Sequence, residues 1–160
     1  MRKHSLWRVV AVAVAAALAS TTPPSLADPS EFEPQAGALD PDYVAGKQAM
    51  DKKNWPEAVR YFNQALLRSP DNADLYNFLG FWHRNLGQFD LAFRYYGRAI
   101  ELNPRHRGAH EYIGEAYLMV NNLAKAEEHL AALEKICLLP CEELDDLKRG
   151  IAAYRKRAAR

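Results

Sequence analysis

Residues 73–104 read ADLYNFLGFWHRNLGQFDLAFRYYGRAIELNP, and this stretch decides the fold class. A short break, NLGQF, separates a first apolar segment from a second one. Small and aromatic residues of the second segment recur at helical spacing, as at Ala92, Tyr96 and Ala99. Pro104 closes the stretch, because proline cannot continue a helix. The stretch therefore predicts two helices joined by a tight turn.

The same pattern occurs three times with a period of 34 residues, set by Gly46, Gly80 and Gly114. The equivalent small and apolar positions in the three copies are Ala58, Ala92 and Ala126, then Phe62, Tyr96 and Leu130. Glycine and alanine at such positions let two helices cross closely. We expect helices at about 39–52, 55–68, 73–86, 89–102, 107–120 and 123–136.

This period and pattern resemble the tetratricopeptide repeat, a helix–turn–helix unit. The resemblance implies an all-α fold, a right-handed superhelical stack of three repeats at 39–72, 73–106 and 107–140. The third copy departs from the pattern at Leu133, which replaces a small residue, and at Pro140, which comes late. Residues 141–157 carry one apolar stripe, acids at the start and bases at the end, as expected for a capping helix. Lipid or nucleic-acid contact by that basic end is the alternative to a solvated face.

The first 27 residues have the pattern of a secretory signal peptide. Basic residues at positions 2, 3 and 8 precede an apolar run at 9–19, and small residues lead to an expected cleavage after Ala27. Residues 28–38 are expected to form a linker. The predicted location is therefore the periplasm of a bacterial cell envelope. An uncleaved anchor or a buried apolar helix is the alternative.

Charge and motifs limit the function classes. The formal net charge of the 160 residues is +1, and loss of the leader leaves 18 basic and 20 acidic residues, a net charge of −2. A basic nucleic-acid footprint is thus absent. No HExxH, GxSxG or Gly-rich phosphate motif is present, so we expect no enzyme activity, cofactor or metal site. His106 and His110 are four apart, but surface histidines near a loop are favoured over metal ligands.

The resemblance also implies a concave face, lined by the first helix of each repeat, that binds an extended peptide or a partner helix. The residues carried over to that groove are Tyr43, Lys47 and Met50, then Asn77, Phe81 and Arg84, then Glu111, Glu115 and Leu118. An asparagine amide can pair with a peptide backbone, and an arginine can hold a carboxylate bidentately. The chain is therefore predicted to be a non-enzymatic adaptor or assembly factor that binds a protein or peptide partner. No nucleic-acid binding and no membrane insertion after cleavage are expected.

Cys137 and Cys141 are the only cysteines of the chain. An even cysteine count in an exported protein predicts a structural disulfide. Four residues of regular helix separate two Cα atoms by ~6.2 Å, within the range that a disulfide tolerates. Haem attachment and a thioredoxin-type centre both need C-x-x-C, which this spacing does not provide. The alternative is a thiol-dependent accessory protein that uses this pair to handle metal or disulfides.

Overall fold

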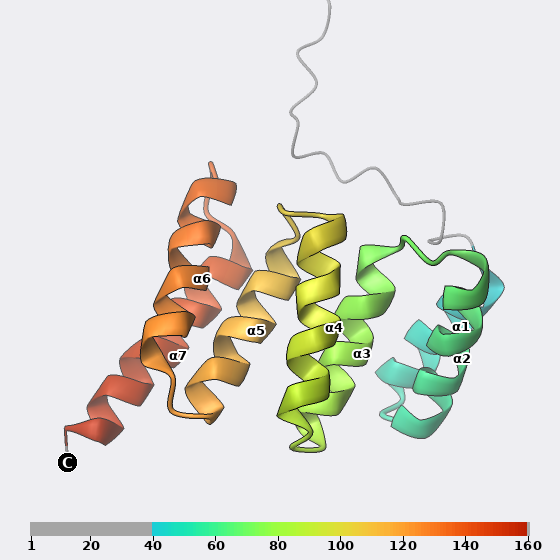
Figure 1. The fold of residues 1–160 in the computed structure, drawn as a ribbon, viewed down its shortest axis with the longest axis horizontal. Helices are drawn as coiled ribbons and strands as arrows, with labels where there is room; N and C mark the ends of the chain where they lie inside the picture. Colours follow the sequence, from blue (N-terminus) through green and yellow to red (C-terminus); the bar gives the residue numbers. More distant parts are fainter. Residues whose placement is uncertain (1–39, 160) are drawn as a thin grey trace, which may run out of the picture. The chain divides into compact units, whose positions relative to one another are not determined.

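A computed structural model describes residues 40–159, so the predicted leader at 1–27 and linker at 28–38 lie outside the described residues. All regular secondary structure of this part of the chain is α-helical (Figure 1). The helices are α1 (Pro41–Asp51), α2 (Trp55–Arg68), α3 (Ala73–Asn85), α4 (Phe89–Leu102), α5 (Arg107–Met119), α6 (Leu123–Ile136) and α7 (Glu142–Ala158).

The helices form three successive pairs, α1 with α2, α3 with α4 and α5 with α6, and α7 packs against both α5 and α6. Each pair also contacts the next one along the chain, which gives the row of helices seen in Figure 1. The predicted all-α repeat stack is confirmed, and the expected helix bounds differ from the observed ones by at most two residues.

Side-chain caps begin four of these helices, because the first N–H groups of a helix have no partner within it. The side chains of Asp40, Asn72, His106 and Asn122 accept backbone N–H hydrogen bonds at the starts of α1, α3, α5 and α6. Three of these caps therefore begin the first helix of a repeat.

The turn inside each repeat contains one residue in the left-handed region of backbone space. These residues are Lys53, Gly87 and Asn121, with φ of 58°, 73° and 61°. They are 34 residues apart, so the turn repeats with the same period as the helices. Only the middle copy uses glycine, the residue that adopts this conformation without a steric penalty.

The regular spacing of Gly46, Gly80 and Gly114 has a direct steric cause. A Cβ atom added at Gly80 would lie 2.6 Å from the Tyr96 ring, and one added at Gly46 would clash with the Phe62 ring. At Gly114 the nearest atom is Leu147 of α7, at 2.7 Å from such a Cβ. In the first two repeats, the space beside the glycine is thus occupied by an aromatic ring of the same repeat. In the third repeat, a side chain of the capping helix occupies it.

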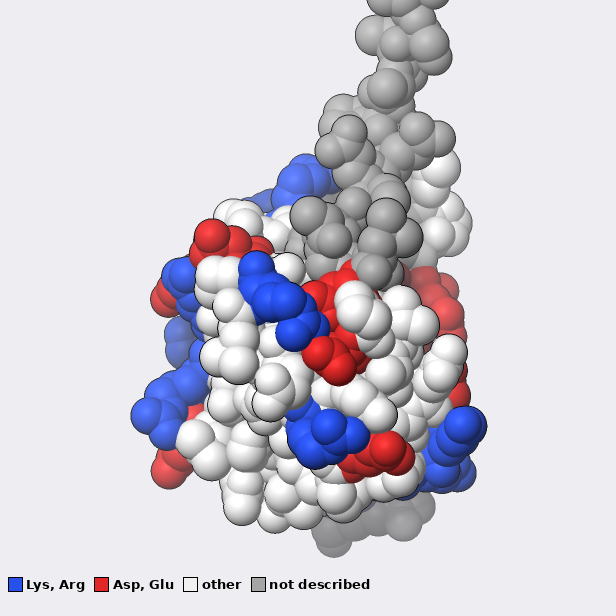
Figure 2. Space-filling model, turned by 90° about the vertical axis from the view of Figure 1, so that its right-hand side faces the viewer, with Lys and Arg blue, Asp and Glu red and all other residues white. Residues whose placement is uncertain are grey.

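Charges of both signs are mixed on the surface. Figure 2 looks onto the α1–α2 end of the stack and shows Lys and Arg side chains interspersed with Asp and Glu. Arg68, for example, pairs with Asp40 at 2.7 Å and also with Asp42. Among residues 40–159, no helix combines the length and the apolar character needed to cross a membrane.

Candidate functional site

The candidate site is the face formed by α3, α5 and α7, the first helices of the second and third repeats and the capping helix. A depression of about 280 Å³ lies there. Its walls are Arg84, Asn85, Glu115, Leu118, Met119, Gly150, Ala153 and Arg157. Every one of these residues belongs to α3, α5 or α7. The structure therefore places Arg84, Glu115 and Leu118, three of the predicted groove residues, around one hollow.

The first helices of neighbouring repeats contact each other in a fixed register. Tyr43 contacts Asp74, Phe81 contacts Tyr112, and Arg84 contacts Glu115, and in each pair the partners are 31 residues apart. We call these contacts the 31-residue ladder. The spacing of 31 residues is three residues less than the 34-residue period. Each side chain therefore contacts the next repeat almost one helical turn before the position equivalent to its own. The predicted groove residues thus contact partners from the neighbouring repeat.

The ladder begins between α1 and α3. The Tyr43 hydroxyl donates a hydrogen bond of 3.4 Å to Asp74 Oδ2, and burial followed by the nearby Asp74 charge raises the pKa of Tyr43 to about 12. Asp74 Oδ1 also lies 3.0 Å from His106 Nε2, so one carboxylate contacts a side chain of α1 and the N-cap residue of α5. Lys47 Nζ lies 4.7 Å from the centroid of the Phe78 ring, where the cation is attracted by the aromatic face. The side chains of Tyr43 and Lys47 therefore already have partners within the stack of helices.

Arg84 is buried and engaged from three sides. Its guanidinium forms an ion pair with Glu115 and donates a hydrogen bond of 3.4 Å to the carbonyl oxygen of Tyr112. The rings of Phe81 and Tyr112 lie 5.1 and 5.2 Å from its central carbon. The expected role of Arg84 as a free grip for a ligand carboxylate does not fit this geometry, since Glu115 of the chain itself takes that place.

Asn77 and Glu111 occupy equivalent positions of the second and third repeats. Unlike the polar side chains of the 31-residue ladder, these two are not paired with another polar side chain of residues 40–159. Only 4% of Asn77 and 8% of Glu111 are exposed. Asn77 Oδ1 has no hydrogen-bond partner among the described residues. Burial, then the neighbouring charges of Glu115 and Glu143, raises the pKa of Glu111 to about 7. These two side chains are therefore buried polar groups whose hydrogen-bonding capacity is open.

Two side chains of the ladder, Asp74 and Tyr112, are not among the predicted groove residues. Asp74 follows Tyr43 by 31 positions, and Tyr112 follows Phe81 by 31 positions. His106 was predicted only as a surface histidine near a loop, and the structure places it at the N-cap of α5 beside Asp74. A comparison of each groove position with the residue 31 further on would have found Asp74 and Tyr112.

His110 forms a second buried polar cluster. Its Nε2 donates to the Pro104 carbonyl oxygen at 3.1 Å, so its Nδ1 accepts from Nδ1 of His129 at 3.0 Å. Burial and the neighbouring His110 lower the pKa of His129 to about 4. The expectation of a surface histidine is thus wrong for His110, which packs inside the third repeat. Across residues 40–159 no three or more His, Cys, Asp or Glu side chains are grouped closely enough to hold a metal ion.

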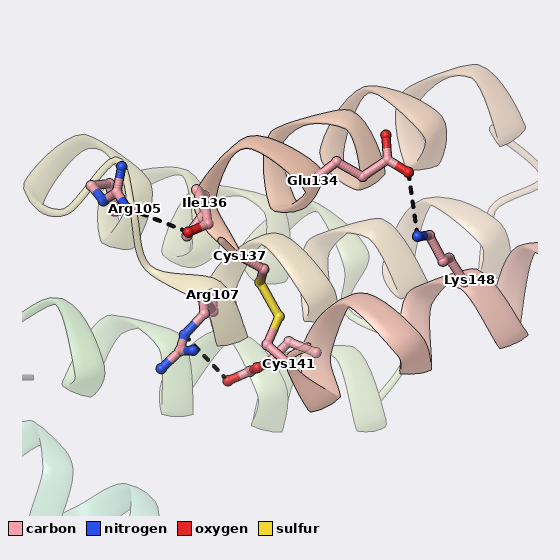
Figure 3. The surroundings of a disulfide bond; sticks show 8 residues. Arg105, Arg107, Glu134, Ile136, Cys137, Cys141 and Lys148 are labelled. Carbon is pink, nitrogen blue, oxygen red and sulfur yellow. Dashed lines mark hydrogen bonds and ion pairs between the residues drawn. A yellow bond between two sulfur atoms is a disulfide. The ribbon is translucent and has the colours of Figure 1, made fainter. Parts of the chain in front are cut away.

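Cys137 and Cys141 form a disulfide between the end of α6 and the start of α7 (Figure 3). Their Cα atoms lie 6.0 Å apart, and Cys141 is the N-cap residue of α7 and is buried. An ion pair of 3.4 Å between Glu134 and Lys148 joins the same two helices (Figure 3). The bridge therefore lies at the elbow between the last repeat and the capping helix.

Comparison with known proteins agrees with this architecture. A tetratricopeptide repeat model matches residues 73–106, and another of the same description matches residues 43–80. The ycf37 protein of Guillardia theta is 35% identical over 91 residues, which are 54% of this chain and 51% of that protein. The Hsp70-Hsp90 organizing protein of Triticum aestivum is 24% identical over 117 residues, 73% of this chain and 20% of that protein. The chain thus spans about half of ycf37 and a smaller part of the organizing protein.

Solved structures share the fold. One is the TPR2B domain of yeast Sti1 in its complex with pHsp70. It has a TM-score of 0.66 and 22% identity, over 72% of this chain and 94% of that chain. The Yersinia enterocolitica chaperone SycD, in complex with a peptide of the translocator YopD, has a TM-score of 0.66 and 18% identity, over 79% and 99% of the two chains. The sequence models and the shared architecture together show that the chain contains tetratricopeptide repeats.

Proposed function

We propose that this chain is a non-enzymatic module that binds a protein or peptide partner on the face formed by α3, α5 and α7. The observation that carries the proposal is the depression of about 280 Å³ between these helices. Leu118, Met119, Gly150 and Ala153 supply apolar surface, and charged side chains stand at its edges. An apolar hollow with a few polar groups is the usual form of a site that takes a side chain of a partner.

Related structures support this proposal. The titles of two of them describe bound partners, pHsp70 in the Sti1 complex and a YopD peptide in the SycD complex. A third, the first repeat domain of Spaghetti, is bound to the HSP90 peptide SRMEEVD. These proteins bind peptides with the architecture that this chain has, so an adaptor or assembly factor is the function that fits best.

The proposal includes export to the cell envelope of a bacterium. Its basis is the leader pattern of residues 1–27, and an oxidising compartment agrees with a disulfide between Cys137 and Cys141. The alternative function, thiol chemistry by this pair, is less well supported, because Cys141 is buried at the start of α7.

Site-specific photo-cross-linking tests the binding face. A photoreactive phenylalanine analogue replaces Met119, which lines the depression and is 57% exposed. The matched control carries it at Leu67 of α2, which is 78% exposed and lies outside the depression. In cells of the source organism, we expect a discrete cross-linked partner from position 119 and none from position 67. Equal labelling at both positions, or a partner captured only from position 67, would contradict the proposed face.

A further inference from the structure

The 31-residue ladder is complementary between α1 and α3 and between α3 and α5, but not between α5 and α7. A hydroxyl meets a carboxylate at Tyr43 and Asp74, and a guanidinium meets a carboxylate at Arg84 and Glu115. The position 31 residues after Glu111 is Glu142. Glu142 adds to the like charges that raise the pKa of Glu111. The residue one ladder step after Glu111 is therefore a second acid, close enough to repel its negative charge.

Glu111 has no internal partner that would compensate its burial. Within the described part of the chain it makes no hydrogen bond or ion pair, although only 8% of it is exposed. Arg84 favours the ionised form of Glu111, but its guanidinium already pairs with Glu115. A buried carboxyl group without a partner costs stability, and such groups are uncommon unless a ligand supplies what is missing.

A second polar side chain, that of Asn77, lies beside Gly108, one helical turn before Glu111 on α5. Asn77 Oδ1 is buried and unpaired among the described residues. The Asn77 amide nitrogen lies 3.3 Å from where a Cβ of Gly108 would be, and Gly108 is three residues before Glu111 on α5. Two polar side chains at equivalent positions of neighbouring repeats thus lie beside the first half of α5, and neither makes a hydrogen bond through its acceptor oxygens within the described part of the chain.

The start of α7 extends this acidic surface. Glu142, Glu143 and Asp145 occupy its first turn. Of these three acids, Glu143 has an ion-pair partner, Arg107, whose Nε lies 3.9 Å from it. The part of the face between α5 and α7 is therefore anionic and rich in acceptors, whereas the nearby guanidinium of Arg84 is neutralised by Glu115.

We propose that Glu111 is a specificity-determining residue that receives a cationic group, a lysine or arginine side chain of the bound peptide, on the face between α5 and α7. The cation would donate to the Glu111 carboxylate and place a positive charge among Glu115, Glu142 and Glu143. This inference rests on the proposed peptide-binding function and deepens it, because it states the chemistry of the partner. It also predicts that a peptide ending in acidic residues and a free carboxylate is a poor ligand.

Selection from a displayed library of random peptides on the mature full-length protein tests this inference. We expect enriched peptides to share a Lys or Arg at one position. One such peptide is synthesised with that residue and again with norleucine in its place, and both are titrated against wild type and Glu111→Gln. Loss of the cation and loss of the carboxylate should each weaken binding about tenfold or more. The two losses together should weaken it little beyond either one, since they remove the same interaction.

Glu128→Gln is the matched control. Glu128 lies on α6, is exposed and pairs with Lys125, so its loss should leave peptide binding unchanged. Circular dichroism establishes that both glutamine variants are folded. Peptides without a shared basic residue, peptides with a preferred acidic C-terminus, or binding that Glu111→Gln leaves intact would each overturn the inference while the proposed function stands. A library that yields no binding peptide would count against both.

Discussion

Two glycines of the second repeat form a matched pair whose replacement by alanine should have opposite effects on stability. Gly87 lies in the turn between α3 and α4 with a φ of 73°, whereas Gly97 lies inside α4. A Cβ atom added at either position meets no other atom within 4 Å. Steric packing is therefore the same for the two substitutions, and only the backbone conformation distinguishes them.

The expected magnitudes follow from that difference. In a helix interior, alanine is more favourable than glycine by about 0.8–1.0 kcal/mol, so Gly97→Ala should raise the free energy of unfolding by that amount. In the left-handed region a Cβ atom costs about 1–2 kcal/mol, so Gly87→Ala should lower it. The two variants should differ in stability by about 2–3 kcal/mol, although each gains a single methyl group.

Urea unfolding followed by circular dichroism at the helical minimum measures these changes. We expect the unfolding midpoint to rise for Gly97→Ala and to fall for Gly87→Ala, with the slope unchanged because the surface exposed on unfolding is the same. Lys53 and Asn121 occupy the equivalent turns at φ of 58° and 61°, so glycine at either position should raise the midpoint.

A shift of both alanine variants in the same direction would refute this reasoning. It would mean that the turn at Gly87 does not hold a left-handed residue, or that α4 does not continue through Gly97. Since the turn recurs at the same place in all three repeats, an unchanged midpoint for Lys53→Gly and Asn121→Gly would count against the shared turn geometry as well.

Three further variants test the packing, the histidine pair and the disulfide. Gly80→Ala should lower the free energy of unfolding by about 1–3 kcal/mol, because its Cβ would lie 2.6 Å from a buried tyrosine ring; an unchanged melting curve would contradict the close crossing. His129 has a folded pKa of about 4, below the unfolded value of 6.5, so the unfolded state binds more protons and stability should fall by on the order of 2 kcal/mol as pH falls from about 6.5 to about 4. His129→Phe should flatten that pH dependence in urea unfolding, and a slope equal to that of wild type would exclude the pair with His110 as its cause. Thiol titration of unreduced mature protein should find no free thiol, and changing both Cys137 and Cys141 to Ser should cost about 2 kcal/mol, since the loop is short; two free thiols would show that the bridge is absent.

Sequence by itself determined the period, the helices and the partners within a helix pair. Helix periodicity, capping and turn chemistry depend on residues close together in the chain, so 34-residue spacing sufficed to predict helices that differ from α1–α6 by at most two residues. The glycines at 46 and 80 each meet an aromatic residue sixteen positions later for the same reason. Two helices joined by a short turn can pack together in few ways, so these partners follow from the repeat alone.

Contacts between neighbouring repeats were decided only by the tertiary structure. Arg84 was expected to face a ligand, but docking of α3 against α5 places it beside Glu115. The side chain nearest to a Cβ atom at Gly114 comes from α7, which supplies Leu147, and not from the third repeat itself. Glu111 is buried, and the acidic first turn of α7 lies close enough to raise its pKa. A long polar side chain can reach several partners, and which one it meets depends on the offset between two packed helices, a quantity that the spacing along one chain segment does not contain.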